Sequence, residues 1–229
     1  MKTKWNLNTF AWVNENKLPS FGRLLSSWLN VHRTFCEEAQ PDFSWEWGHN
    51  ERAQIGLLGN AATLIGGVSI EEGCIEKHSG SGQKSQGRSD LWLRFPTLDC
   101  DYLVEAKIEQ YLDVTEPNTA VQKILNKMSA ARQNAESLKH RKEKIVAMTF
   151  LSLRFADENL DSLSQKTDDV ISHIWNKIRN EQKLDAIGAI WMNAHDLQQS
   201  REERRAMDSK WTNVHFGMVL LASRIEISE

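Results

Sequence analysis

Hydrophobic and polar positions follow two periods along the chain, and together they predict an α/β fold. Apolar residues recur at helical spacing in some segments, whereas shorter apolar runs predict strands. The helices are expected at residues 19–38, 47–65, 118–140 and 168–180. The strands are expected at residues 68–76, 89–95, 102–108, 144–155, 184–192 and 215–227. Ser20 is expected to cap the first helix, and Gly66-Gly67 to end the second.

The order of these elements indicates how they pack. Three strand-like runs precede the helix at 118–140, and a near-continuous apolar strand follows it. Early antiparallel strands followed by a crossover helix and a buried strand are typical of a mixed central β-sheet flanked by helices. The 229 residues suit one domain. We therefore expect a single α/β domain.

Composition narrows the class of protein. Hydrophobic residues make up 40% and charged residues 26% of the chain, as in soluble globular domains. No apolar run is long enough to span a bilayer and no signal-peptide pattern opens the chain, so we expect a cytoplasmic protein with no membrane partner. Three widely spaced cysteines without a CxxC pair argue against a disulfide framework or a structural zinc site. The seven histidines show no ligand spacing such as HExxH, which favours structural roles.

Candidate chemistry lies on the second and third predicted strands. Asp90 stands at the start of one, and Glu105 and Lys107 stand near the end of the next. Residues two apart in a strand point the same way, so Glu105 and Lys107 share a face from which Ala106 points away. If the two strands pair, Asp90 comes close to Glu105. The alternative is that Glu105 and Lys107 form a structural cross-strand ion pair on a sheet surface. The apolar residues that flank them favour a central strand instead.

Two carboxylates held close together have a clear chemical use. They repel each other unless a cation lies between them. Oxygen ligands select a hard ion such as Mg²⁺, which also binds phosphate. Such an ion lowers the pKa of its water and stabilises the charge that builds on a phosphodiester under attack, while a neighbouring lysine orients the water or the phosphate.

The arrangement Asp90, then fourteen residues, then Glu105-Ala106-Lys107 on consecutive strands resembles the PD-(D/E)XK (restriction endonuclease-like) superfamily. Ser89 stands where the family pattern has proline. The resemblance covers residues 47–155 and implies a three-layer fold with a central mixed sheet flanked by helices. It further implies that Asp90, Glu105 and the Ala106 carbonyl hold the metal and that Lys107 serves catalysis. On this basis residues 1–45 form an N-terminal helical elaboration, 46–155 the catalytic core, and 156–229 a C-terminal helix and strands that complete the sheet.

Further residues are candidates for the same site. Many family members place an acidic residue on the helix before the first strand, and Glu51 falls in helical register with the apolar stripe there. A carboxylate in that register faces the sheet, where it is costly without a partner or metal. Its alternative role is a carboxylate favoured by the helix dipole, and Glu46 is the second choice. Glutamines on the later helix contact the metal-bound water or phosphate in some branches, which leaves two candidates, Gln122 and Gln133.

The Gly/Ser-rich segment 77–88 is predicted to be an exposed, mobile loop beside this site. Its default interpretation is a solvated hairpin loop, and the alternative is that Lys77, Lys84 and Arg88 contact phosphates of a nucleic acid. Asp99 and Asp101 flank the third strand. They are expected to be turn residues, with Asp101 the alternative metal ligand because it shares the Glu105 face.

The functional hypothesis that follows is a Mg²⁺-dependent deoxyribonuclease, with Mn²⁺ as a substitute ion, acting in restriction, defence or DNA repair. The net charge of −3 argues against a protein that coats nucleic acid by charge alone. No P-loop is present, so no nucleotide cofactor is expected. A homodimer or a subunit of a defence or repair complex is the expected assembly. The alternative function is a catalytically silent binding or scaffold subunit with the same fold, and RNA is not excluded as substrate.

Overall fold

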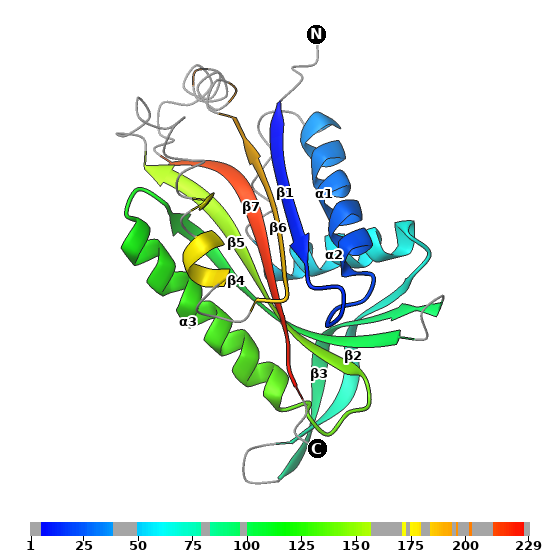
Figure 1. Cartoon of the computed structure of the whole chain (residues 1–229). Helices are drawn as coiled ribbons and strands as arrows, with labels where there is room; N and C mark the ends of the chain where they lie inside the picture. Colours follow the sequence, from blue (N-terminus) through cyan, green and yellow to red (C-terminus); the bar gives the residue numbers. More distant parts are fainter. Residues whose placement is uncertain are drawn as a thin grey trace.

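The computed structural model describes residues 6–38, 50–78, 83–96, 100–156, 171–172, 175–179, 184–193, 196, 202 and 213–226. Within these residues the chain forms a seven-stranded mixed sheet with helices on both faces (Figure 1). The strands are β1 (Leu7–Val13), β2 (Val68–His78), β3 (Lys84–Phe95), β4 (Cys100–Asp113), β5 (Lys144–Ala156), β6 (Ala186–Met192) and β7 (Asn213–Arg224). The helices are α1 (Phe21–Glu38), α2 (Glu51–Leu64) and α3 (Pro117–Glu136).

The strand order is β1-β6-β7-β5-β4-β3-β2. The pair β4 and β5 is parallel, and the other neighbours are antiparallel. Helix α3 connects the parallel pair, as a parallel connection requires. The described side chains of β5, β6 and β7 are almost entirely buried, which explains why these strands read as continuous apolar runs. The predicted mixed sheet is confirmed.

Two hydrophobic layers sandwich the sheet. Helices α1 and α2 pack Trp28 and Leu58 against the face that carries Leu91, Val104 and Ala106. Helix α3 covers the opposite face, where its alanines lie against Leu103. Figure 1 shows this division, with α3 on one side of the sheet and α1 and α2 on the other. Alternation along β4 therefore decides which side chains meet which helices.

The predicted helices form close to their expected bounds, but the end signals differ. The first turn of α1 is capped by Glu15, whose carboxylate accepts hydrogen bonds of 2.9 Å from the N–H groups of Ser20 and Gly22. Asn50 caps α2 by accepting from the N–H of Arg52. Helix α2 ends at Leu64, and Gly66 two residues later takes a left-handed φ of 83°, in keeping with the predicted stop at Gly66-Gly67. The described part of the helix expected at 168–180, residues 171–172 and 175–179, is helical.

Two expectations were wrong. The N-terminal region is not helical throughout, because β1 pairs antiparallel with β6 and forms an edge of the sheet. The residues of β1 are partly buried without regular alternation. The segment therefore lacks the period of two that predicts a strand. The predicted loop at 77–88 is largely strand: β2 and β3 pair as far as His78 and Lys84. Backbone pairing across this hairpin does not need apolar side chains.

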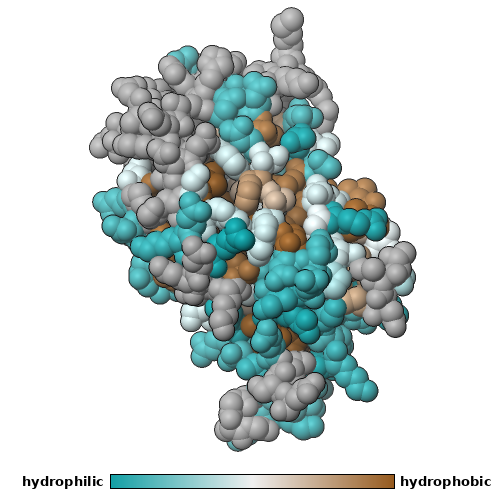
Figure 2. Space-filling model, in the orientation of Figure 1, coloured by the Kyte–Doolittle hydropathy of each residue, from teal (hydrophilic) through white to brown (hydrophobic). Residues whose placement is uncertain are grey.

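The face of the molecule shown in Figure 2 is mostly polar. In Figure 2 hydrophilic residues dominate the described part of the visible face, and hydrophobic residues gather in its upper middle, around β1 and β6. None of the described helices combines the length and apolar character needed to cross a membrane.

Candidate metal and phosphate site

The predicted site lies where β3 and β4 part. The two strands pair from Phe95–Cys100 to Leu91–Val104. Beyond Val104, β4 continues beside β5 on its other edge. The backbone groups of β4 that face β3 are therefore left for side chains to satisfy, and an unmet buried N–H is costly.

Two carboxylates take up these free backbone groups. Asp90 Oδ2 accepts a 2.7 Å hydrogen bond from the N–H of Ala106. Glu51 Oε2, from the first residue of α2, accepts a 3.1 Å bond from the N–H of Ile108. Alternate residues of a strand present their N–H groups to the same edge. Asp90 and Glu51 are thus held side by side along one edge of β4.

Glu105 completes the acidic group and is the most buried of its members. The residue is 1% exposed. Burial is the main cause of the raised pKa of its carboxyl, and the nearby charge of Asp90 raises that pKa further. Lys77 opposes both effects by donating a 2.7 Å hydrogen bond to Glu105 Oε1. A carboxylate in this setting needs a cation beside it.

Lys107 supplies a second positive charge. Its ammonium donates a 2.7 Å hydrogen bond to the carbonyl of Ala106 and lies 3.6 Å from Glu51 Oε1. Lys77 and Lys107 therefore touch oxygens of the predicted ligand set from two directions. Asp90 and Glu51 lie along one edge of β4, and Glu105 is close enough for the charge of Asp90 to raise the pKa of its carboxyl.

The donor types are those that Mg²⁺ or Mn²⁺ takes, but among the described residues the oxygens of Glu51, Asp90 and Glu105 do not all lie within 4.8 Å of one another. Three carboxylates and a backbone carbonyl offer oxygen alone, which hard divalent cations prefer over imidazole or thiolate. The three carboxylates face only two ammonium groups among the contacts described, so a further cation would improve the charge balance. The need for positive charge is greatest at Glu105, because water cannot screen the charge of a buried carboxylate.

Some predicted contacts have other partners in the structure. Lys77 pairs with Glu105, Lys84 with Glu76 at 3.2 Å, and Arg88 with Glu72 at 2.7 Å. Asp101, the alternative ligand, pairs with Arg94 at 3.4 Å, at the paired end of β3 and β4.

Among the described residues, no hydrogen bond joins the predicted glutamines to the candidate site residues. Gln122 lies on the exposed face of α3 and donates to Asn126, and Gln133 is also exposed. The second choice for the helix carboxylate, Glu46, lies outside the described residues, as does Asp99.

Sequence reasoning missed Arg52, which follows Glu51 in the first turn of α2. Its guanidinium and that of Arg88 both bind the carboxylate of Glu72. Glu72 has a φ of 50°, in the left-handed region that non-glycine residues rarely adopt. Both arginines are well exposed, so this cluster presents charged donors near Asp90 and Glu51. The position of Arg52 next to the candidate ligand Glu51 could have identified it from the sequence.

Two hollows lie elsewhere in the described part of the chain. An open pocket of about 590 Å³ is lined by residues around Cys100 and His140–Lys144, and one of about 930 Å³ lies between α1 and α2. The candidate site lies at a strand edge that neither pocket includes. The chain matches no family model, no curated protein and no solved structure in the comparisons made with known proteins.

Proposed function

We propose that this protein is a Mg²⁺-dependent nuclease that hydrolyses DNA phosphodiester bonds and has a restriction endonuclease-like three-layer fold. One observation supports the proposal: Asp90 and Glu51 bind neighbouring N–H groups of β4 where β3 leaves it, on the strand that carries Glu105 and Lys107. Glu51, Asp90 and Glu105 come from three different elements, and an ordinary surface ion pair would not require all three.

Each residue then has a role set by its contacts. Asp90 and Glu51 present one carboxylate oxygen each while the other binds the β4 backbone, which fixes their orientation. Glu105 and the Ala106 carbonyl complete the cation site. The bound Mg²⁺ would polarise an attacking water and neutralise charge on the phosphate.

Three basic residues are proposed to contact the substrate. Lys107 holds its ammonium 2.7 Å from the Ala106 carbonyl, so it can donate to a phosphate oxygen or orient the attacking water there. Arg52 and Arg88 offer further donors to neighbouring phosphates. Binding of DNA by these arginines requires exchange of Glu72 for phosphate as their partner.

The direct test is an assay of the purified full-length chain. Circular DNA, linear DNA and RNA are each incubated with Mg²⁺, with Mn²⁺ and with EDTA. The proposal predicts cleavage of DNA with either ion and none with EDTA. Nicking of the circle indicates an endonuclease, and loss of linear DNA alone indicates an exonuclease. Cleavage that persists in EDTA, or that is confined to RNA, contradicts the proposal.

The ion pair between Lys77 and Glu105 favours a second candidate, a catalytically silent binding subunit. A lysine 2.7 Å from the most buried carboxylate competes with a divalent cation for the same oxygen. This candidate predicts DNA binding that is indifferent to Mg²⁺, with no cleavage. Mg²⁺ titration of DNA binding and cleavage on one sample separates the two functions.

The biological setting remains part of the proposal. Restriction, defence and DNA repair in the cytoplasm use this chemistry, with the protein acting as a homodimer or as a subunit of a larger complex. Mass measurement of the chain alone and on DNA tests the dimer. A monomer bound to DNA would count against it.

A further inference from the structure

A second group of metal-ligating side chains lies on the β2–β3 hairpin, apart from the oxygen site. Glu76 and His78 of β2 meet His140, which follows the end of α3. One ligand atom from each residue falls within 4.8 Å of the others. We propose that these three residues bind a transition-metal ion of the Zn²⁺ type.

The three side chains already contact one another. The imidazoles of His78 and His140 stack at 3.6 Å with an interplanar angle of 5°. His78 Nε2 lies 2.8 Å from Glu76 Oε1. Because imidazole lone pairs lie in the ring planes, the two rings must turn out of this stack before a nitrogen from each can bind an ion shared with Glu76. Glu76 and His78 are two apart in a strand and therefore share a face, a spacing that a search for HExxH overlooks.

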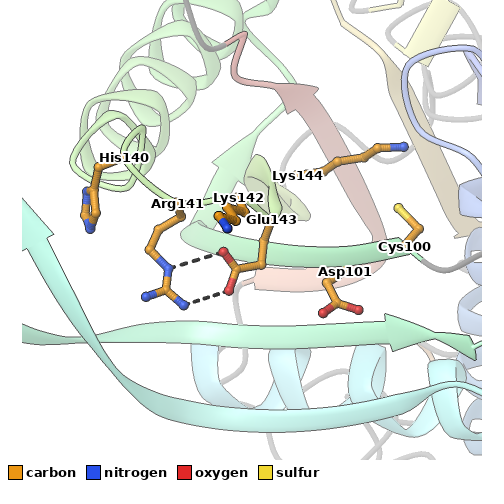
Figure 3. Close-up of a pocket in the computed structure, with 7 residues that line it drawn as sticks. All are labelled: Cys100, Asp101, His140, Arg141, Lys142, Glu143 and Lys144. Atoms are coloured by element: carbon orange, nitrogen blue, oxygen red, sulfur yellow. Dashed lines mark hydrogen bonds and ion pairs between the residues drawn. The ribbon is translucent and has the colours of Figure 1, made fainter.

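The backbone holds the two elements in place. The N–H of His78 donates a 3.0 Å hydrogen bond to the carbonyl of Ser137, just beyond α3. Figure 3 shows His140 at one side of the pocket, with Arg141 and Glu143 paired beside it. Because Arg141 takes up Glu143, that carboxylate does not compete with Glu76 for the ion. The hairpin and the segment after α3 are thus joined before any ion binds.

The ligand chemistry selects the ion. Two imidazoles and one carboxylate suit Zn²⁺, which takes four ligands and leaves a place here for water, whereas Mg²⁺ prefers oxygen alone. Lys84 lies 3.2 Å from Glu76 Oε1. Its ammonium neutralises the carboxylate at present, so the ion must displace it.

Binding at this site would act on the rest of the hairpin. Lys77 stands between Glu76 and His78 and points the other way, to Glu105. An ion that joins β2 to the segment after α3 would hold Lys77 in place as well. The inference itself does not depend on nuclease activity.

The test is Zn²⁺ binding by the full-length chain, measured by competition with a coloured zinc chelator. Glu76→Gln, His78→Gln and His140→Gln are each expected to weaken binding at least tenfold. Glu136→Gln, a nearby exposed carboxylate, controls for loss of surface charge and should bind like the parent. Cys74→Ser removes an exposed thiol, and Asp90→Asn removes a carboxylate of the oxygen site. Neither group is a proposed Zn²⁺ ligand, so both variants should bind Zn²⁺ like the parent.

Thermal unfolding with and without Zn²⁺ provides the second measurement. An ion that binds only the folded chain raises the Tm. The parent should show this rise and His140→Gln should not, while circular dichroism confirms that each variant is folded. Parent-like Zn²⁺ binding by His140→Gln, or loss of binding in Cys74→Ser or Asp90→Asn, would overturn the site.

Discussion

Asp90 and Ala106 are joined across two strands by a 2.7 Å hydrogen bond from the Ala106 N–H to Asp90 Oδ2. The bond forms where the backbone ladder between β3 and β4 has ended. It fixes the carboxylate of one strand against the strand that carries Glu105 and Lys107. The fold therefore orients Asp90 before any ligand arrives, as the proposed site requires.

Replacement of Lys77 tests how strongly its charge supports Glu105. Lys77→Met leaves a carboxylate whose side chain is only 2% exposed without its hydrogen-bond donor. We expect a loss of about 2 kcal/mol in the free energy of unfolding, less than for a fully buried pair because 23% of the Lys77 side chain is exposed. Mg²⁺ binding should tighten, since a competing cation has gone. Urea unfolding and calorimetric Mg²⁺ titration measure the two effects.

The matched control is Lys84→Met on the same hairpin. Lys84 pairs with Glu76 at an exposed position, so its loss should lower stability much less than the loss of Lys77 does. Mg²⁺ binding should not change. Equal destabilisation by both variants, or weaker Mg²⁺ binding in Lys77→Met, would contradict the role given to Lys77.

Glu51→Gln separates the charge of this residue from its hydrogen bond. The amide oxygen can still accept from the N–H of Ile108, so the fold should be kept. Loss of the negative charge should weaken Mg²⁺ binding and cleavage by at least about tenfold. Glu71→Gln, an exposed carboxylate on β2, is the control. A Glu51→Gln variant with parent-like Mg²⁺ affinity would assign Glu51 to helix capping alone.

A buried histidine gives the stability a pH dependence. His32 is 2% exposed, and burial lowers its pKa from 6.5 to about 4. Below pH 6.5 the unfolded chain gains a proton that the folded chain refuses, so stability falls as the pH drops from 6.5 towards 4. The loss is on the order of 3 kcal/mol.

His32→Gln provides the comparison, because it does not titrate in this range and its amide can still donate to Gln54. Urea unfolding at pH 7 and at pH 4.5 should show the stability advantage of the parent over His32→Gln shrinking at the lower pH. Parallel pH curves for the two proteins would rule out this role for His32.

Much of the sheet could be predicted because its strands carry strong patterns. Strands β5 and β6 are continuous apolar runs, and buried strands of that kind are easily recognised. Strand β1 was missed because edge strands satisfy their hydrogen bonds with any residue. The extension of β2 and β3 into the segment 77–88 was missed for a related reason, since Lys77 and Arg88 make backbone pairs although the segment contains no apolar residue.

The placement of the candidate residues could be predicted in part. Strand alternation and the helical register pointed to Asp90, Glu105 and Glu51, because both depend on short-range geometry. The partner of Lys77 could not be predicted, since the twist that carries its ammonium to Glu105 depends on tertiary packing. The meeting of His78 with His140 has the same origin, because 61 residues separate them in the chain.

Metal-dependent cleavage by matched pairs of variants tests the central claim most directly. Supercoiled plasmid is incubated with Mg²⁺ and with the parent, Asp90→Asn, or Asp101→Asn, which removes a carboxylate that pairs with Arg94 outside the site. Lys107→Met is compared in the same way with Lys127→Met, which pairs with Glu109. We predict cleavage by the parent and both controls, and a loss of at least a hundredfold in Asp90→Asn and Lys107→Met, with all variants folded. Parent-like cleavage by either Asp90→Asn or Lys107→Met would contradict the proposed site.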